Sequence, residues 1–233
     1  MTLQNRYKFR IPDEIITRLG RLSAEQLWRD RIRKKTVFSL ITDNNSKILD
    51  IGCGFGDTAI ELALKGNQVL GIDIDKEVIN QAKQLAADFN VNNAVFENED
   101  FLSKDFKGEE FDGIILSEAL EHFDDPLPII KKVQCLLKNG GWLVISIPNI
   151  ASLRNRLVFV LIGVFPDSQE FHRYYFTRKD LSSRLRASGF RIEKTRGDFI
   201  PFHCSFPGIG IKCFLANIFI GLSYTIAVRA IKI

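Results

Sequence analysis

Short apolar runs alternate with amphipathic stretches through the middle of the chain. Five runs of strand length, each bounded by glycine, proline or polar residues, predict strands at 47–51, 68–72, 94–97, 111–116 and 142–147. Stretches between them carry apolar residues at helical spacing and predict helices at 58–65, 76–89 and 126–137. Strands that alternate with helices form a parallel sheet covered on both faces. We therefore expect a doubly wound α/β fold, whose ligands bind at the carboxyl ends of the strands.

The pattern changes after residue 177. A helix is predicted at 178–188, with Gly189 as its C-terminal cap, followed by strands at 190–196 and 226–233. We expect these two strands to form an antiparallel hairpin at the sheet edge. The complete sheet would then be seven-stranded and mostly parallel, with an antiparallel C-terminal strand.

Two further features frame this core. A helix is predicted at 24–41, with Ser23 as its N-terminal cap, and is expected to lie over the ligand mouth. Gly140 and Gly141 predict a turn before the fifth strand.

No repeat, low-complexity stretch or Gly/Pro/Ser linker divides the chain. We expect an N-terminal helical cover at 1–44 and one domain at 45–233, with an apolar lid or insert at about 149–176 and 199–222. Within it, residues 209–228 carry only one charge, Lys212, and approach the length of a membrane span. Glycines interrupt the segment and its end is typical of a strand, which favours a buried strand; peripheral membrane contact stays open.

Composition narrows the possible partners and the compartment. The chain of 233 residues has 32 basic and 28 acidic residues, interspersed apart from a basic bias at 6–35, which does not favour nucleic acid. The cysteines lack the paired spacing of a metal site: Cys53, Cys135, Cys204 and Cys213. Residues 1–10 are polar, without the apolar core of a secretion signal. We expect free thiols and a cytoplasmic location.

A glycine-rich loop joins the first predicted strand of the sheet to the helix that follows. Glycines there permit a sharp turn and expose backbone amides to a ligand. The third glycine comes one residue earlier than in the dinucleotide fingerprint G-x-G-x-x-G, because Asp57 occupies that position, which argues against NAD. The loop alone is also compatible with a simple tight turn. Its candidate cofactor-binding residues are Asp50, Gly52, Cys53, Gly54 and Gly56.

Acidic residues follow the second and third predicted strands. Asp73, next to Ile74, ends the second strand, where a carboxylate can accept both hydroxyls of a ribose. Asp100 follows the third strand and can accept an amino proton of adenine while Phe101 covers the ring. A turn residue is the alternative for Asp73, and a surface turn or helix cap for Asp100. All these candidates are expected at one edge of the sheet, which predicts a single nucleoside-binding site.

These motifs closely resemble those of the class I S-adenosylmethionine-dependent methyltransferases. The resemblance covers about residues 45–200 and rests first on ILDIGCGFG and GIDID. SEALEHFDDP, LLKNGGWLVISIPN and HRYYFTRKDLSSRLRASGF resemble the branch that includes ubiquinone-pathway O-methyltransferases and small-RNA 3′-end methyltransferases. The resemblance implies methyl transfer from S-adenosylmethionine.

The same resemblance implies roles for individual residues. The methionine end would be held by Asp50, Gly52 and Gly54, the ribose by Asp73, and the adenine by Asp100 and Phe101. Three residues after the fourth strand would line the sulfonium side: Ser117, Ala119 and Leu120.

Two histidines are candidate catalytic bases. A sulfonium methyl group is already a strong electrophile, so the protein chiefly needs to align the acceptor and exclude water. A phenol, hydroxyl or amine acceptor must also lose a proton, and His122 is the first candidate to remove it because imidazole titrates near neutral pH. His172, close to Tyr174 and Tyr175, is the second. For each histidine, the alternative is a structural role beside a neighbouring carboxylate or backbone group.

A cluster around His122 also predicts a divalent metal ion. Glu118, Glu121 and His122 offer carboxylate and imidazole ligands for Mg²⁺ or Mn²⁺, and His172 could complete the site. This pattern resembles the metal set of the RNA 3′-end enzymes, in which a metal polarises the hydroxyl that is methylated. The alternative is that the carboxylates cap the following helix near Asp124 and Asp125 and face solvent.

The acceptor is left open between three hypotheses. The apolar stretches at 157–165 and 199–220 favour a small or lipid-linked acceptor and O-methylation, although they could instead pack a lid and a homodimer interface. An RNA 3′-end acceptor is supported only by the Glu-x-x-Glu-His pattern, since a broad basic surface is lacking. A cofactor-binding protein without catalysis is the third, because fold does not guarantee function.

Overall fold

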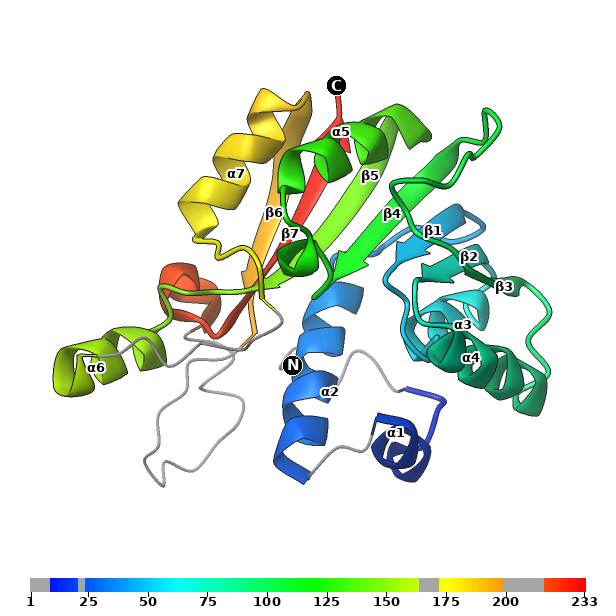
Figure 1. Cartoon of the computed structure of the whole chain (residues 1–233), viewed down its shortest axis with the longest axis horizontal. Coiled ribbons are helices and arrows are strands. Elements are labelled where there is room, and N and C mark those ends of the chain that lie inside the picture. Colours follow the sequence, from blue (N-terminus) through cyan, green and yellow to red (C-terminus); the bar gives the residue numbers. More distant parts are fainter. Residues whose placement is uncertain (1–8, 21–23, 164–171, 199–215) are drawn as a thin grey trace.

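A computed structural model describes residues 9–20, 24–163, 172–198 and 216–233. One seven-stranded sheet runs through them, in the order β3-β2-β1-β4-β5-β7-β6 (Figure 1). The strands are β1 (Lys47–Ile51), β2 (Gln68–Asp73), β3 (Ala94–Asn98), β4 (Phe111–Ser117), β5 (Leu137–Pro148), β6 (Phe190–Gly197) and β7 (Thr225–Lys232). Strands β1 to β5 pair in parallel, and β7 is antiparallel to both of its neighbours. The predicted doubly wound fold is confirmed.

Helices cover both faces of the sheet. They are α1 (Asp13–Gly20), α2 (Ala24–Phe38), α3 (Asp57–Ala63), α4 (Lys76–Asp88), α5 (Pro126–Leu136), α6 (Leu153–Ile162) and α7 (Arg178–Ala187), with short 3₁₀ turns η2 (Leu120–His122) and η3 (Ile220–Leu222). Apolar residues of α3 and α4 belong to one hydrophobic cluster, and those of α5 and α7 to a second one on the opposite face. The two clusters explain why the central strands are apolar along almost their whole length.

Strand β5 differs from the predicted turn and short strand. It begins at Leu137 and runs through Gly140, whose φ is 75°, so the expected turn is an irregularity inside the strand. The pairing with β4 shifts register between Phe111 and Gly113. Gly113 leaves room for the Trp142 ring, since a Cβ there would lie 2.1 Å from a ring carbon. Pairing passes from Phe111–Leu137 to Gly113–Trp142, so residues 138–141 of β5 have no partner residue in β4.

The C-terminal strands form the predicted antiparallel pair at one edge of the sheet. Strand β7 lies between β5 and β6, so β6 is the outermost strand. Strand β7 accounts for the end of the apolar segment 209–228, and six consecutive residues of it from Thr225 are buried. No helix within the described residues is long and apolar enough to cross a membrane. Ser23, the predicted helix cap, and residues 209–215 lie outside the described residues.

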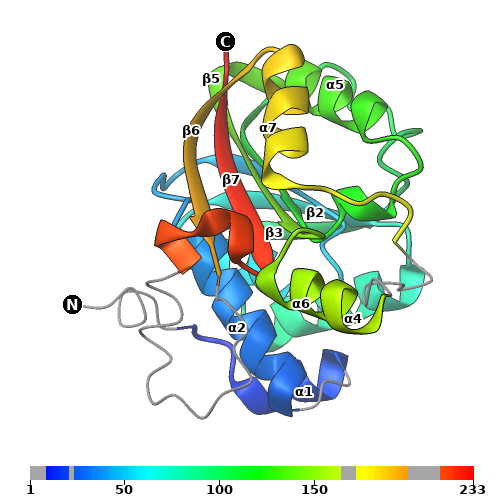
Figure 2. The ribbon, with the colours of Figure 1, turned by 90° about the vertical axis from the view of Figure 1, so that its left-hand side faces the viewer.

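Two helices were not predicted as such. Helix α1 is amphipathic but only eight residues long. Helix α6 is apolar on all sides after Arg156, so the sequence of α6 does not show the alternation of apolar and polar faces that indicates a helix. Figure 2 shows α1, α2 and α6 gathered at the end of the sheet where the parallel strands have their carboxyl ends. Helix α2 ends at Phe38, three residues before its predicted end.

The N-terminal segment is fastened to the sheet domain by buried polar contacts. The Glu61 carboxylate of α3 accepts hydrogen bonds from the backbone amides of Arg10 (2.6 Å) and Ile11 (2.8 Å). Lys34 of α2 donates to Asp30 (2.7 Å) and to Asp57, the first residue of α3. These contacts place α2 against the glycine-rich loop.

Candidate active site

The glycine-rich loop after β1 has the left-handed backbone that its sequence predicts. Gly52, Gly54 and Gly56 have φ values of 69°, 53° and 77°. A Cβ at Gly52 would lie 2.9 Å from the Cβ of Ala119, and one at Gly56 would lie 2.5 Å from the Phe96 ring. The loop therefore requires glycine both for its backbone conformation and for close packing.

Asp73 holds this loop in place from the end of β2. Its carboxylate accepts hydrogen bonds from the amides of Gly54 (2.9 Å) and Asp75 (3.0 Å). The amides of Gly52 and Cys53 donate to the Ile72 carbonyl at 2.9 and 3.0 Å. The predicted pairing of loop and acid thus exists as direct contacts, and Asp73 remains half-buried at the cavity described next.

A cavity of about 520 Å³ lies at the carboxyl ends of β1 to β4, and we call it the first cavity. Its lining includes seven of the residues that were predicted to bind cofactor or metal, together with His122: Gly52, Asp73, Ile74, Asp100, Phe101, Glu118 and Ala119. Phe101 is buried and packs edge-on against Phe106, which fixes the ring as part of the cavity wall. The strand-end acids and the loop therefore meet in one place.

Other predicted cofactor residues lie around this cavity without being part of its lining. Leu120 is fully buried in the core, and the Ser117 hydroxyl lies 3.0 Å from the hydroxyl of Ser146. Asp50, Cys53, Gly54 and Gly56 shape the loop from within. Burial and the charges of Asp50 and Asp73 raise the pKa of the Cys53 thiol, so this cysteine stays protonated.

Asp50 is a buried carboxyl group in β1, two residues before the first glycine of the loop. Its Oδ2 atom has no hydrogen-bond partner among the described residues. Burial, reinforced by the charges of Asp57 and Asp73 and opposed by Lys34, raises the pKa of Asp50 to about 8. A buried acid with an unused oxygen suits a positively charged ligand group.

A second cavity of about 330 Å³ adjoins the first, and we call it the second cavity. Helix α2 contributes Arg29, Asp30 and Arg33 to its lining. Glu118 and His122 line both cavities. The sequence predicted a helix over the ligand mouth but did not single out these charged residues. Their spacing places them on one side of α2, and this spacing could have indicated them. Asp198 and Tyr224, also in the lining, come from distant parts of the chain and gave no local signal.

The structure brings the two predicted catalytic histidines together. The ring centroids of His122 and His172 are 5.3 Å apart. Their approach follows from backbone pairing, because the amides of Arg173 and Tyr174 donate to the Glu121 carbonyl at 2.9 and 3.1 Å. One ligand atom from each of Glu121, His122 and His172 can be chosen so that all lie within 4.8 Å of one another.

Glu118 takes a different position from the other predicted metal ligands. Its φ is 53°, its amide donates to the Ser146 carbonyl at 2.9 Å, and it is not part of that three-residue group. An Oε2 atom lies 3.7 Å from Arg33. Burial raises the pKa of Glu118, and the Arg33 charge opposes this rise. The cap of α5 is Asp125, so neither Glu118 nor the buried Glu121 serves as that cap.

Comparison with known proteins assigns the family. A family model described as a methyltransferase domain matches residues 22–195. The chain belongs to this methyltransferase family. A ubiquinone biosynthesis O-methyltransferase of Hydrogenovibrio crunogenus is 30% identical over 168 residues, which is 67% of each chain. Its counterpart from Xanthomonas axonopodis pv. citri is 28% identical over 172 residues, 71% of each chain.

Solved structures agree with this assignment. An S-adenosylmethionine-dependent methyltransferase of Methanosarcina mazei superposes with a TM-score of 0.62 at 26% identity, covering 84% of this chain and 96% of that one. Magnesium protoporphyrin IX methyltransferase of Synechocystis, with bound SAH, has a TM-score of 0.66 at 20% identity and covers 94% and 93%. The present protein is therefore an S-adenosylmethionine-dependent methyltransferase of class I, as the sequence motifs predicted.

Proposed function

We propose that this methyltransferase methylates an oxygen atom of a small or lipid-linked acceptor, with the methyl donor in the first cavity and the acceptor in the second. The observation that carries the proposal is the wall that the two cavities share, Glu118 and His122. Methyl transfer needs donor and acceptor in line, and two adjoining cavities offer that arrangement. The relatives named ubiquinone biosynthesis O-methyltransferase support an oxygen acceptor.

The residues around the first cavity fit the methyl donor. When bound, S-adenosylmethionine supplies a methyl group activated by a positive sulfonium. Asp50, with its buried unused oxygen, would face the ammonium group of the methionine end, beside the amides of the glycine loop. Asp73 would accept the ribose hydroxyls, and Asp100 an amino proton of adenine. Phe101 would contact the adenine ring from the cavity wall.

His122 is the proposed general base. It lies between the cavities, within reach of an acceptor oxygen that faces the methyl donor. Its imidazole would take the proton of the acceptor hydroxyl as the oxygen gains the methyl group. His172, next to it, would orient the acceptor or take the proton onward.

A divalent cation is a second proposal for the same place. The convergence of Glu121, His122 and His172 favours Mg²⁺ or Mn²⁺, with mixed carboxylate and imidazole ligands. Glu118 would not be a direct ligand in this arrangement, because it faces Arg33. Such an ion would polarise the acceptor hydroxyl, and the same chemistry would serve an RNA 3′ end.

Calorimetry and turnover test the proposal together. The protein is titrated with S-adenosylmethionine, with and without Mg²⁺ or Mn²⁺, and methyl transfer to phenolic acceptors with and without an apolar tail is measured. His122→Gln should keep its affinity for the donor and lower kcat by about 100- to 10,000-fold. Unchanged turnover would remove His122 from catalysis. Donor binding without turnover on any acceptor would support a non-catalytic role, and binding of RNA that weakens steeply with salt would support the RNA alternative.

The surroundings of the enzyme are part of the proposal as well. The free thiols of Cys53 and Cys135 support a reducing compartment such as the cytoplasm. The exposed apolar side chains at the end of α6, Val160, Leu161 and Ile162, support either a homodimer or contact with a membrane surface. Basic residues beside the apolar ones would favour the membrane surface over the homodimer.

A further inference from the structure

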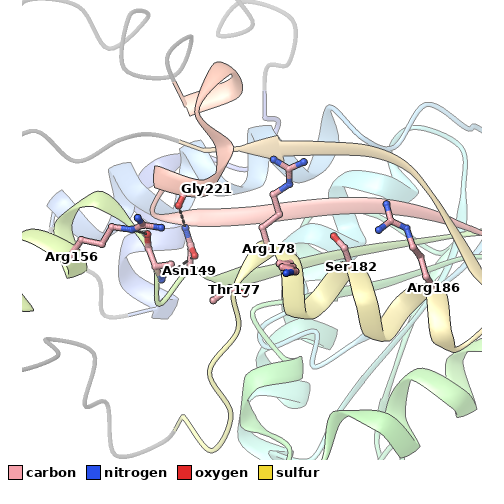
Figure 3. A pocket seen from close by; sticks show the side chains of 9 residues that line it. Asn149, Arg156, Thr177, Arg178, Ser182, Arg186 and Gly221 are labelled. Atoms are coloured by element: carbon pink, nitrogen blue, oxygen red, sulfur yellow. Dashed lines mark hydrogen bonds between the residues drawn. The ribbon is translucent and has the colours of Figure 1, made fainter.

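A third cavity, of about 530 Å³, lies between the start of α6 and one face of α7, and we call it the basic cavity (Figure 3). Four cationic side chains line it: Arg156, Arg178, Lys179 and Arg186. No carboxylate is among its lining residues in the described part of the chain. A cavity with this lining selects an anion.

The basic side chains on α7 lack protein partners. Within the described residues, the side chains of Arg178, Lys179 and Arg186 make no hydrogen bond or ion pair, whereas Arg184, on another face of α7, is bound to Asp180 at 3.1 Å. Arg178 and Arg186 repeat at intervals of four residues with Ser182 between them, so they form one stripe along the helix. Arg178, Lys179 and Arg186 are exposed, so water and salt weaken their mutual repulsion, and an anion bound between them would reduce it further.

Ser182 adds a directional hydrogen-bonding group to this stripe. Its side chain lines the cavity although the residue is only 9% exposed, and its hydroxyl has no hydrogen-bond partner among the described residues. Figure 3 shows the hydroxyl on the cavity side of α7, between Arg178 and Arg186. Two guanidinium groups and a hydroxyl match the oxygen atoms of a phosphate group.

Helix α6 presents apolar side chains to solvent beside this cavity. Val160, Leu161 and Ile162 are 79%, 79% and 70% exposed, and the helix carries no charge after Arg156. Arg156 itself belongs to both features, because it lies on α6 and lines the basic cavity. Figure 1 shows α6 projecting from the body of the molecule. Exposed apolar side chains next to basic ones are typical of a surface that rests in a membrane interface.

We propose that the basic cavity binds the phosphate group of an anionic membrane phospholipid while Val160, Leu161 and Ile162 of α6 enter the membrane surface. An RNA would use the cations but leave α6 exposed, and a second protein chain with an apolar face would leave the cations unpaired. An anionic lipid membrane would pair the cations of the basic cavity and also cover the apolar side chains of α6. With ten residues, α6 lies on the membrane and does not cross it.

This surface adjoins the second cavity. Asn149 lines the basic cavity and directly follows Pro148, which lines the second cavity. The Asn149 side chain donates to the carbonyl of Gly221 at 3.1 Å within the basic cavity (Figure 3), and its backbone amide donates at 2.9 Å to the carbonyl of Tyr224, which lines the second cavity. Membrane docking would therefore bring the acceptor cavity close to lipid. The inference goes beyond the proposed function and does not depend on which acceptor is used.

Vesicle binding tests the inference. The protein is floated with vesicles of phosphatidylcholine alone and with vesicles containing phosphatidylglycerol. We expect binding only to the anionic vesicles, weakened about 10- to 30-fold by Arg178→Gln with Arg186→Gln. Val160→Ser with Leu161→Ser should weaken it by a similar factor. Two matched controls should bind as the original chain does: Lys76→Gln with Lys83→Gln, which removes two exposed charges of α4, and Val95→Ser with Ile233→Ser, which removes two exposed apolar side chains elsewhere.

Each other outcome overturns the inference. The inference fails if the protein does not bind vesicles at all. It also fails if the control pairs weaken binding as much as the test pairs do, or if either test pair leaves binding unchanged. Inorganic phosphate that binds the protein without any vesicle binding would assign the cavity to a soluble anion. A short RNA that binds with an affinity sensitive to the arginine pair alone would assign it to nucleic acid. Donor affinity, measured on every variant, shows that the fold is intact and keeps this result separate from the proposed function.

Discussion

At the scale of single residues, the carboxyl groups of Asp50 and Asp73, at the ends of β1 and β2, differ in the contacts that they make. Asp73 already accepts two backbone amides, one from the glycine loop, before any ligand is considered. Asp50 is buried with an unused oxygen and a pKa raised to about 8. The Asp73 carboxylate therefore shapes the loop. The Asp50 carboxyl group is mostly protonated at neutral pH, and a cationic ligand would favour loss of its proton.

Proton release on donor binding should report on Asp50. At pH 7 a carboxyl group with a pKa of about 8 is about nine-tenths protonated. An ammonium group placed beside it favours the charged form and lowers its pKa, so binding should release about 0.9 proton. Affinity should accordingly rise as the pH increases from 6 towards 8. Calorimetry in buffers of different ionisation enthalpy measures the release, which should vanish in Asp50→Asn; an equal release by this variant would contradict the assignment.

Replacement of Asp73 should weaken donor binding by a moderate factor. Asp73→Ala removes the acceptor proposed for the ribose and also frees the Gly54 amide. The expected loss is about 1 to 3 kcal/mol, or about 5- to 150-fold in Kd. Asp88→Ala, at the exposed end of α4, is the control and should leave Kd unchanged. An unaltered Kd for Asp73→Ala would refute the ribose assignment.

At the scale of elements, the path of the glycine loop depends on residues of neighbouring elements. Gly56 packs against the Phe96 ring of β3 and the Ala82 methyl group of α4. Gly52 packs against Ala119, which follows β4. The loop thus connects three other segments, and its conformation cannot change without moving them.

Alanine at Gly56 should destabilise the fold far more than alanine at a glycine with open surroundings. Both Gly56 and Gly108 have a φ of 77°, but a Cβ at Gly56 would be 2.5 Å from Phe96 whereas nothing lies within 4 Å at Gly108. Gly108→Ala should cost about 1 kcal/mol from backbone strain alone. Gly56→Ala adds overpacking and should cost about 2 to 4 kcal/mol. Chemical denaturation measures both, and equal losses would show that the Phe96 contact is unimportant.

At the scale of the whole molecule, the N-terminal helices and the sheet domain share one buried ion network. Lys34 of α2 binds Asp30 and Asp57, and its side chain is 7% exposed. Residues of α1 and α2 also belong to the hydrophobic cluster of α3 and α4. The helix that closes the second cavity is thereby coupled to the loop that borders the first.

Loss of the Lys34 charge should affect both stability and donor binding. Lys34→Met leaves the buried Asp57 without its cation and removes the positive charge that opposes the rise in the pKa of Asp50. The free energy of unfolding should fall by about 3 kcal/mol, and Kd for the donor should rise. Lys35→Met, the same change at the next residue, is the control because Lys35 makes no ion pair within the described residues. Equal stability of the two variants would contradict the coupling.

The amino-acid sequence by itself determined the fold class and the family, and it predicted most of the residues that line the first cavity. These depend on local signals: apolar runs of strand length, glycines where a strand becomes a helix, and acids at strand ends. Parallel strands bring such ends together at one edge, which is why Asp73, Asp100 and the glycine loop could be placed in one site before their contacts were known.

Tertiary structure alone decided the second cavity, the basic cavity and the order of the last two strands. Arg33, Asp198 and Tyr224 line one cavity although they are far apart in the chain. Within the predicted antiparallel pair at the sheet edge, β7 lies beside β5, where six consecutive residues of it are buried, and β6 is outermost. Such contacts depend on how distant segments pack against each other. The pattern of apolar and polar residues predicts each element, but it does not show which distant elements meet.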